Sequence, residues 1–460
     1  MQQGVRIEEQ SAGQPWLSRA SLFFVGMFER YMPDSFVIAL LLTMITAVLA
    51  LLFAPHRTPA VILAGWYKGM FDIASFAFMV ALMLVTGYAL AVSRPVSKLL
   101  STLASLPTTP AAAATLTVMV IAAASLLHWA FGLTVTGLFA REIAKRMKVD
   151  FAWIVAASFS GFALFTQGLS CSVELISATH GSPLNIVERV TGHILPLSES
   201  ELARFNLIPV VVLLVLLPLL FIAMRPTGEN VVAADPEKLR KEDEVPGAGL
   251  AERGTTIADR LSRAWWVNLL IVLAGVGYFA LNGLSFDLVS VIVMFLIAGM
   301  LLHWRPDAYA SAINNGARLT GPLLLQFPFY GGIMGIMMTT GLANVIAQWF
   351  ASFSTPATVP FWGFVSSLII SLFVPSAGGH WAVQGPFIIP VAHTLHSSVA
   401  ATLIGVSAGE GTADMIQPMW MLPVLAITGV RLRRVMGFTI MSFFTMVIVW
   451  SVALLLLTPA

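Results

Sequence analysis

The sequence predicts an all-α polytopic membrane protein, built from two inverted repeats with about nine transmembrane helices and two re-entrant hairpins. Of its 460 residues, 58% are hydrophobic and only 10% are charged, a balance typical of a chain that lies in a bilayer. Apolar runs recur along it, each close to the roughly 20 residues that a helix needs to cross the hydrocarbon core. A hydrophilic stretch, residues 226–264, divides these runs into two sets.

The first half is expected at residues 36–225. Its elements, in order, are spans at 36–54 and 75–92, a broken pair at 111–140, a long broken span at 151–180 and a last span at 207–224. Residues 1–35 before it form an expected cytoplasmic segment with an amphipathic stretch, and no cleaved signal peptide is expected there.

The second half, residues 287–457, repeats the order of the first. The linker 226–264 carries charges of both signs, and a connecting span at 265–281 follows it. The later elements are spans at 287–303 and 320–342, a broken pair at 361–392, a broken span at 398–429 and a last span at 437–457. The tripeptide His-Trp-Ala occurs at His128 and again at His380, at the same position in the two broken pairs.

The positions of the basic residues predict the topology. Lys and Arg concentrate at Arg141–Lys148, in the linker, at Arg305 and Arg318, and at Arg431–Arg434, so we expect these places in the cytoplasm. The pair 111–140 then enters from the cytoplasm and the pair 361–392 from outside, which inverts the second half. The N-terminus is expected inside and the C-terminus outside; the alternative is that both pairs cross the membrane completely.

Several functional classes find no support in the sequence. The net charge is +2 and no basic stripe suggests nucleic acid. A single cysteine, Cys171, excludes an internal disulfide framework, and the eight histidines lack the spacing of a zinc protease. Neither a Walker A motif nor a Gly-x-Ser-x-Gly elbow is present. We therefore expect neither an enzyme nor a cofactor.

The stretch P-S-A-G-G-H-W-A-V-Q-G-P-F, residues 375–387, interrupts an apolar run. Irregular backbone at membrane depth leaves polar groups that lipid cannot satisfy, so it indicates a cavity. Broken helices in inverted halves are typical of secondary transporters, whose helix N-termini face anions. The residues expected to bind substrate here are Ser376, Gly378, Gly379, His380 and Gln384. Alternatively, the glycines permit close helix packing and the His-Trp pair anchors an interface.

Two further stretches carry polar residues at corresponding places in the two halves. Residues 405–420 contain Glu410 and Asp414, one helical turn apart, which could carry a coupling proton, help to hold a cation or form a structural pair. A Na⁺ site is conceivable near Ser376, Ser407 and Thr412. In the first half, hydroxyls and amides that could replace water around an anion or sodium, and are expected to bind substrate, are Thr166, Gln167, Ser170 and Ser172. Glu174 either belongs to this group or lies near the outer mouth, and the hairpin residue His128 is also expected to bind substrate.

Other polar residues carry less information. Gln326, beside Pro328, either lines the same cavity or only accompanies a kink. His393 and His396 are expected at an aqueous edge, and Cys171 is expected to be a small packing residue.

The chain resembles the short-chain fatty acid uptake transporter family over almost its whole length. The motifs that carry the resemblance are M-P-D-S-F-V-I-A-L-L-L-T from Met32, V-T-G-Y-A-L-A from Val85, F-A-R-E-I-A-K-R from Phe139, L-L-Q-F-P-F-Y-G-G-I from Leu324, V-P-S-A-G-G-H-W-A-V-Q-G-P-F-I-I-P from Val374, and G-E followed by Q-P-x-W between Gly409 and Trp420. The P-S-A-G-G element is also similar to a hairpin tip of the wider ion transporter superfamily.

The resemblance implies uptake of small monocarboxylates such as butyrate or acetoacetate in a bacterial cytoplasmic membrane. It also implies a homodimer with elevator-type scaffold and transport domains, and it adds Gln417 to the motif positions at the site. The sequence departs from the family pattern at His128, at Asp414 and in T-Q-G-L-S-C-S-V-E from Thr166. Because these departures fall at expected site elements, the substrate and the coupling ion stay open.

The sequence therefore predicts a secondary active transporter for short-chain fatty acids, with H⁺ or Na⁺ as the coupling ion. The alternatives are a passive anion channel or uniporter, a carrier for another small organic anion, and a receptor or scaffold that binds solute without moving it.

Overall fold

The computed structural model describes residues 35–228, 231–244, 256–284, 286–372, 374, 377–417 and 419–459. Every regular element in these ranges is a helix. The expected amphipathic N-terminal stretch and the predicted site residue Ser376 lie outside the described residues. An all-helical architecture is thus confirmed for the part of the chain that the structure describes.

The helices follow the order of the apolar runs. Up to the linker they are α3 (Ser35–Phe53), α4 (Pro59–Asp72), α5 (Ala74–Ala91), α6 (Arg94–Leu103), α7 (Pro110–Leu127), α8 (Trp129–Ala144), α9 (Phe151–Phe162), the 3₁₀ helix η1 (Ala163–Gln167), α10 (Ser172–Ala178), α11 (Ile186–Thr191) and α12 (Arg204–Ala223). From the linker onward they are α13 (Pro236–Glu244), α14 (Ile257–Ser262), α15 (Trp265–Asn282), α16 (Leu288–His303), α17 (Pro306–Ala317), α18 (Gly321–Thr340), α19 (Leu342–Phe353), α20 (Val359–Ser371), α21 (Ala377–Thr394), α22 (Val399–Ala413), α23 (Met421–Thr428) and α24 (Leu432–Leu456).

Six helices in the described ranges are long and apolar enough to cross a membrane. They are Pro59–Ala91, Pro110–Leu127, Phe151–Ala178, Arg204–Ala223, Trp265–Asn282 and Leu432–Leu456. A seventh candidate is the pair α18–α19, which bends by 78° at Gly341. A multi-pass membrane protein is therefore confirmed, whereas the count of nine spans, which also relies on shorter apolar helices such as α3 and α16, stays a prediction.

The sequence prediction omitted α4. In the structure α4 continues into α5 after a break at Ile73, so one helical segment replaces the expected shorter span. The start of α4 is marked by Thr58, whose side chain accepts a hydrogen bond from the Val61 amide, and by Pro59 in the first turn. Both features are ordinary helix start signals, so the start of α4 could have been predicted from the sequence.

Each expected broken pair is a helical hairpin. In the first, α7 and α8 pack together and meet at His128, whose backbone is extended. In the second, α20 and α21 pack together, and α21 is a continuous helix through Gly378 and Pro386, where the sequence analysis expected irregular backbone. The helix that follows each hairpin lies against its first arm, α9 against α7 and α22 against α20. The repeat of two halves and their inversion in a membrane stay predictions.

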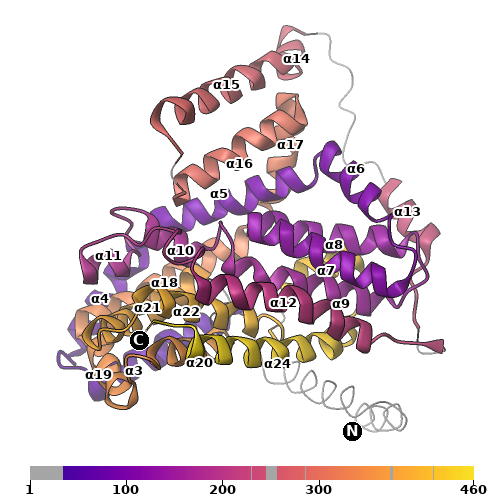
Figure 1. The fold of residues 1–460 in the computed structure, drawn as a ribbon. Coiled ribbons are helices and arrows are strands. Elements are labelled where there is room, and N and C mark those ends of the chain that lie inside the picture. The colour runs from indigo at the N-terminus through magenta and orange to yellow at the C-terminus, as the bar shows by residue number, and fades with distance from the viewer. Residues whose placement is uncertain are drawn as a thin grey trace.

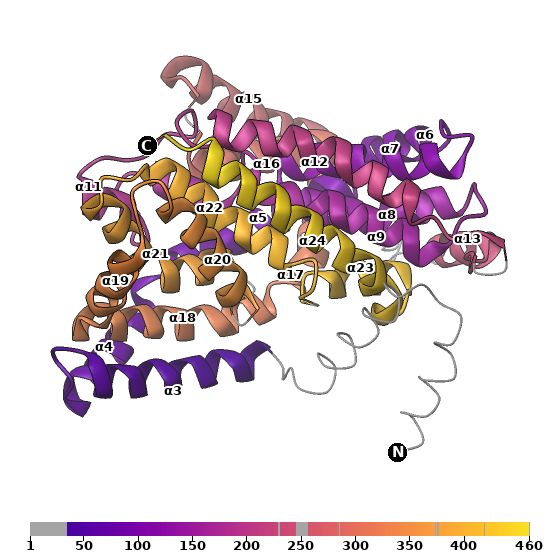
Figure 2. The same cartoon turned by 60° about the horizontal axis from the view of Figure 1, so that its bottom comes forward.

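The helices form a broad bundle with one peripheral layer. In Figure 1, α16 and α17 lie on α5, and α15 lies beyond them at the edge of the molecule. Only Asn268 and Val272 of α15 are buried. Figure 2 shows α3 at the opposite edge, alongside α18. The broken segments and both hairpins lie in the bundle between this layer and α3.

The linker is tied to the bundle at its described residues. Arg141 of α8 donates hydrogen bonds to the carbonyl oxygen of Leu239 in α13 (3.1 Å) and to that of Ile427 in α23 (2.8 Å). Asp150 accepts from the Val232 amide and from Arg434, both at 2.9 Å. The linker therefore contacts helices from both halves on the face where the sequence predicts the cytoplasm.

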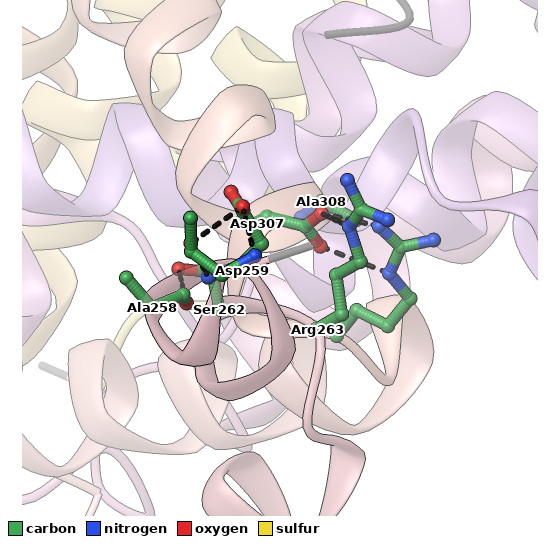
Figure 3. A network of polar contacts seen from close by, with 8 residues as sticks. Ala258, Asp259, Ser262, Arg263, Asp307 and Ala308 are labelled. Atoms are coloured by element: carbon green, nitrogen blue, oxygen red, sulfur yellow. Dashed lines mark hydrogen bonds and ion pairs between the residues drawn. The ribbon is translucent and has the colours of Figure 1, made fainter. Parts of the chain in front are cut away.

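A second polar network joins the end of the linker to the peripheral layer. Asp307, at the start of α17, accepts a hydrogen bond from Arg305 (3.0 Å) and lies 4.0 Å from the guanidinium of Arg263. Figure 3 shows Asp307 and Arg263 close together, with Asp259 of the capping box at the start of α14 beside them. These contacts connect the end of the linker to the start of α17.

Candidate functional site

The two broken segments contact each other inside the bundle. The helix α22 packs on η1, where the first broken segment changes from α-helical to 3₁₀ geometry. Gly411 makes this approach possible, because a Cβ there would lie 2.5 Å from the Ala163 carbonyl oxygen. The polar residues that the sequence analysis assigned to two different halves are thereby brought to one place.

Carboxylates gather at this contact. Glu174 of α10 accepts a hydrogen bond from Ser407 of α22, and Glu174 and Asp414 both interact electrostatically with Glu410. Each of the three residues is at most 1% exposed. The position of Glu174 is therefore internal, and not at an outer mouth.

These carboxylates lack partners to an unusual degree. Among the described residues, both carboxylate oxygens of Glu410, both of Asp414 and one of Glu174 have no hydrogen-bond partner. Thr412 Oγ1 and Gln167 Nε2 are buried without one as well. Buried polar groups normally find partners, and an ionised carboxylate without a cation is costly to bury. The cluster is therefore suited to carrying a proton.

The metal prediction stays open. Within the described part of the chain, no group of three His, Cys, Asp or Glu residues could hold a metal ion. A Na⁺ site of hydroxyl and carbonyl oxygens near Ser376, Ser407 and Thr412 is a different donor set. Ser407 already donates to Glu174 and to the Leu403 carbonyl (3.1 Å), whereas the hydroxyl of Thr412 is unpartnered in the described structure.

His380 lies at the centre of the second hairpin. Its Nδ1 is 2.7 Å from Ser371 Oγ and its Nε2 is 3.2 Å from Ser367 Oγ, both on α20. On its own helix, Nε2 also pairs with Gln384 Oε1. Gln384 in turn donates to the Gly363 carbonyl (2.8 Å) and to Ser366 Oγ (2.9 Å). His380 and Gln384 therefore hold the two arms of the hairpin together.

The glycines at the start of α21 face aromatic rings. A Cβ on Gly378 would lie 2.6 Å from Cζ of Phe76, and one on Gly379 would lie 2.8 Å from Cε2 of Tyr330. This geometry fits the alternative that these glycines permit close packing. Gln326 accepts a hydrogen bond from the Tyr330 hydroxyl at 3.0 Å, so it supports the ring that covers Gly379.

The tip of the first hairpin packs on the first broken segment. Ser170 Oγ accepts a hydrogen bond from the Trp129 amide at 2.8 Å, and the Leu126 carbonyl accepts one from the Leu169 amide at 2.8 Å. His128 Nδ1 caps α8 by accepting from the Phe131 amide, while its buried Nε2 has no partner in the described structure. His128 and Ser170 thus lie in one contact between the tip of the first hairpin and the first broken segment.

The remaining predicted residues occupy various environments. Thr166 donates to Gln167 Oε1 at 2.9 Å, and Ser172 is buried at the start of α10. Gln417 is buried and accepts from the Met419 amide at 3.2 Å. His393 and His396 are exposed, which agrees with an aqueous edge, and Cys171 is fully buried.

Glu201 is a site residue that the sequence analysis missed. It lies in the loop before α12, is 2% exposed, and accepts a hydrogen bond from Asn206 Nδ2 at 2.7 Å. Burial raises the pKa of Glu201 well above its ordinary value and the neighbouring Glu174 raises it further, whereas the Asn206 hydrogen bond lowers it. Because it lies in a loop between apolar runs, no periodic pattern could have indicated its burial.

Glu201→Gln is expected to flatten the pH dependence of thermal stability. Because folding raises the pKa of Glu201, the protonated carboxyl stabilises the fold at acid pH, and this contribution is lost as the pH rises from the ordinary value of 4.5 through the raised one. Glutamine keeps the acceptor for Asn206 and does not ionise. The wild-type melting midpoint should fall by about 1–2 °C more per pH unit than that of the variant. Melting curves across this range, with the exposed Glu199→Gln as control, check the difference, and equal slopes would contradict it.

Comparisons with known proteins agree on one family. The model of the family described as "Short chain fatty acid transporter" matches residues 16–457. Two curated relatives share the name "Putative short-chain fatty acid transporter". The one from Escherichia coli K12 is 36% identical over 445 residues, which is 96% of this chain and 100% of the relative. The one from Haemophilus influenzae Rd is 34% identical over 430 residues, 92% of this chain and 96% of the relative.

Two solved transporters share the fold at low identity. The YdaH transporter of Alcanivorax borkumensis, described as having an unusual topology, has a TM-score of 0.55 and 17% identity, over 92% of this chain and 97% of that one. MtrF of Neisseria gonorrhoeae, described within a class of antimetabolite efflux pumps, has a TM-score of 0.61 and 13% identity, over 95% and 97%. These likenesses concern the fold, whereas the sequence matches concern the family. The chain belongs to the short-chain fatty acid transporter family and is a transporter, not an enzyme.

Proposed function

We propose that the protein is a secondary active transporter that imports short-chain fatty acids or related small monocarboxylates, coupled to the movement of H⁺ or Na⁺. The single observation that carries this proposal is the group of buried carboxylates at the contact of the two broken segments. A transporter that uses an ion gradient needs buried groups that bind and release a proton or another cation. Glu174, Glu410 and Asp414 have no ion-pair partner among the described residues, so they are free to do so.

In this proposal, the substrate binds between the hairpins and the broken segments. Ser376 and the amides near Gly378 and Gly379 at the start of α21 would receive the carboxylate, since the N-terminal end of a helix favours an anion. His380 and Gln384 hold this end in place through α20. On the other side, the tip of the first hairpin, near His128 and Ser170, would close the site. Substrate and coupling ion would then bind on neighbouring segments that move together.

The finer features of the family resemblance belong to the same proposal. The protein would work as a homodimer in the bacterial cytoplasmic membrane, with its N-terminus cytoplasmic and its C-terminus periplasmic. The transport movement would be of the elevator type, in which the hairpins and broken segments move against a scaffold. The placement of Arg141 and Arg434 beside the linker supports this orientation, because basic residues favour the cytoplasmic side.

The test is uptake of labelled butyrate and acetoacetate into proteoliposomes. An inward proton gradient, an inward sodium gradient, or neither is imposed in parallel. Accumulation above equilibrium under one gradient would support the proposal and identify the ion. Equilibration without accumulation would contradict coupling, and absence of flux for all small monocarboxylates would contradict the substrate class.

Glu410→Gln is expected to abolish accumulation while leaving exchange of substrate across the membrane. Glutamine has nearly the same shape but cannot bind or release a proton, and its amide is a weaker ligand for sodium than a carboxylate. The accumulation ratio should therefore fall to about 1, because an uncoupled carrier only equilibrates its substrate. Glu199→Gln, on an exposed loop, is the matched control. Accumulation by Glu410→Gln with an unchanged dependence on pH and sodium would remove Glu410 from the coupling mechanism.

A further inference from the structure

A cavity of about 360 Å³ lies next to the second hairpin but outside the carboxylate cluster. It lies between α11, the bend of α18 and α19 at Gly341, and the second half of α21. Figures 1 and 2 both show these elements gathered at one end of the molecule. Its volume is at the lower end of the range of about 300–1,000 Å³ for small-molecule sites.

The lining of this cavity has an apolar floor and a polar rim. Ile186, Met337, Ala343 and Pro386 are buried and form the floor. On the rim, the exposed residues include Arg189 and Asn344. Arg189 is the one charged residue among the described residues that line the cavity. An apolar wall with one guanidinium group matches a small molecule that has a short acyl chain and a carboxylate.

The guanidinium of Arg189 is available to an anion. It donates one hydrogen bond, to the Pro183 carbonyl at 2.8 Å, and it forms no ion pair within the described part of the chain. The neighbouring Glu188 is engaged elsewhere, since it pairs with His180 and accepts from the Gly181 amide at 2.8 Å. Asp72 of α4 interacts with Arg189 electrostatically without an ion pair. Arg189 thus has donors left for an anion.

We propose that this cavity is a capture site for the substrate, in which Arg189 binds the carboxylate and the floor receives the short acyl chain. The inference rests on the proposed transport of monocarboxylates and adds a second binding position to it. The floor residue Pro386 lies on α21, as His380 and Gln384 do. A bound carboxylate would therefore lie along the same helix whose N-terminal end forms the proposed central site.

The test relies on the burial of the single native cysteine, which allows an introduced thiol to be labelled selectively. Because Cys171 is buried, Asn344→Cys places one accessible thiol on the rim of the cavity. Its labelling by a negatively charged thiosulfonate reagent is followed on the purified full-length protein, with and without butyrate. We expect butyrate to slow labelling at least about fivefold, and neutral butyramide, which has the same size, not to do so. Ser352→Cys, exposed on the same helix α19 but outside the cavity, should label at one rate throughout.

The role of Arg189 is tested in the same background. Arg189→Gln should abolish protection and raise the KM for butyrate uptake about tenfold, with little change in the maximal rate, because the group acts before the central site. Arg189→Lys should give a degree of protection and a KM between those of the wild type and those of Arg189→Gln. Arg204→Gln, an exposed arginine at the start of α12, is the matched control and should behave as wild type.

The outcomes separate the two proposals. Transport of butyrate without protection of Asn344→Cys, or with an unchanged KM in Arg189→Gln, would overturn the capture site and leave the transport proposal standing. Protection that depends on Arg189 in a protein that moves no monocarboxylate would support the site and overturn the transport proposal.

Discussion

Uptake of butyrate by His380→Ala is expected to fall about a hundredfold, although the protein still folds. The imidazole is fully buried and joins Ser367 and Ser371 of α20 to Gln384 of α21. Alanine removes this junction, so the start of α21 is no longer held against α20. A displacement of about 1 Å at a binding group can reduce a rate by about two orders of magnitude. Initial rates in proteoliposomes, normalised to folded protein, measure the effect.

Stability and transport must be separated in this experiment. The buried hydroxyl and amide groups left without partners cost about 1–3 kcal/mol each, so we expect the melting midpoint to fall by no more than about 5 °C. His303→Ala is the matched control, because His303 also bridges two helices, with its Nε2 2.7 Å from the Ala89 carbonyl, but outside the hairpins. It should lose comparable stability and keep its uptake. Normal uptake by His380→Ala would remove the residue from the mechanism.

The sequence was informative about the fold where a local pattern carried the signal. The break at His128 between α7 and α8 was predicted because a polar residue interrupts an apolar run there. Gly378, Gly379 and Pro386 were expected to interrupt the helix as well, but they lie within the continuous helix α21. The helix α4 was missed because Lys68 and Asp72 within it weaken its hydropathy, although Thr58 and Pro59 mark its start. Charged residues on one face of a helix lower its hydropathy averaged over a window of residues, so such a helix is easily missed.

The candidate site was predictable in composition but not in its contacts. Residues such as Glu174 and Glu410 could be selected because carboxylates are rare in membrane segments. Their meeting depends on the packing of α22 on η1 and α10, a tertiary contact between distant segments that no local pattern encodes. For the same reason, the contacts of His380 with Ser367 and Ser371 of α20 could not be predicted, and its role in substrate binding stays a prediction.

Gly335→Leu is expected to prevent accumulation of folded protein. The helices α4 and α18 carry the patterns G-W-Y-K-G from Gly65 and G-G-I-M-G from Gly331, and they cross with these glycines in contact. A Cβ on Gly335 would lie 2.8 Å from the Cα of Gly69. Small residues four positions apart allow helix backbones to approach in membranes, where packing drives association. Because backbone cannot move aside as a flexible side chain can, a leucine should force the helices apart and cost more than about 3 kcal/mol.

A matched substitution distinguishes this packing effect from the general effect of a leucine in an apolar helix. Gly277 of α15 has no heavy atom within 4 Å of an added Cβ, so Gly277→Leu adds the same side chain where there is open space. Size-exclusion profiles and melting midpoints of fluorescent fusions should show a wild-type peak for Gly277→Leu and an aggregated or absent one for Gly335→Leu. A folded, active Gly335→Leu would mean that α4 and α18 do not cross at these glycines. In that case the position of α18, and with it the Tyr330 ring that covers Gly379, would have to be different from the one described.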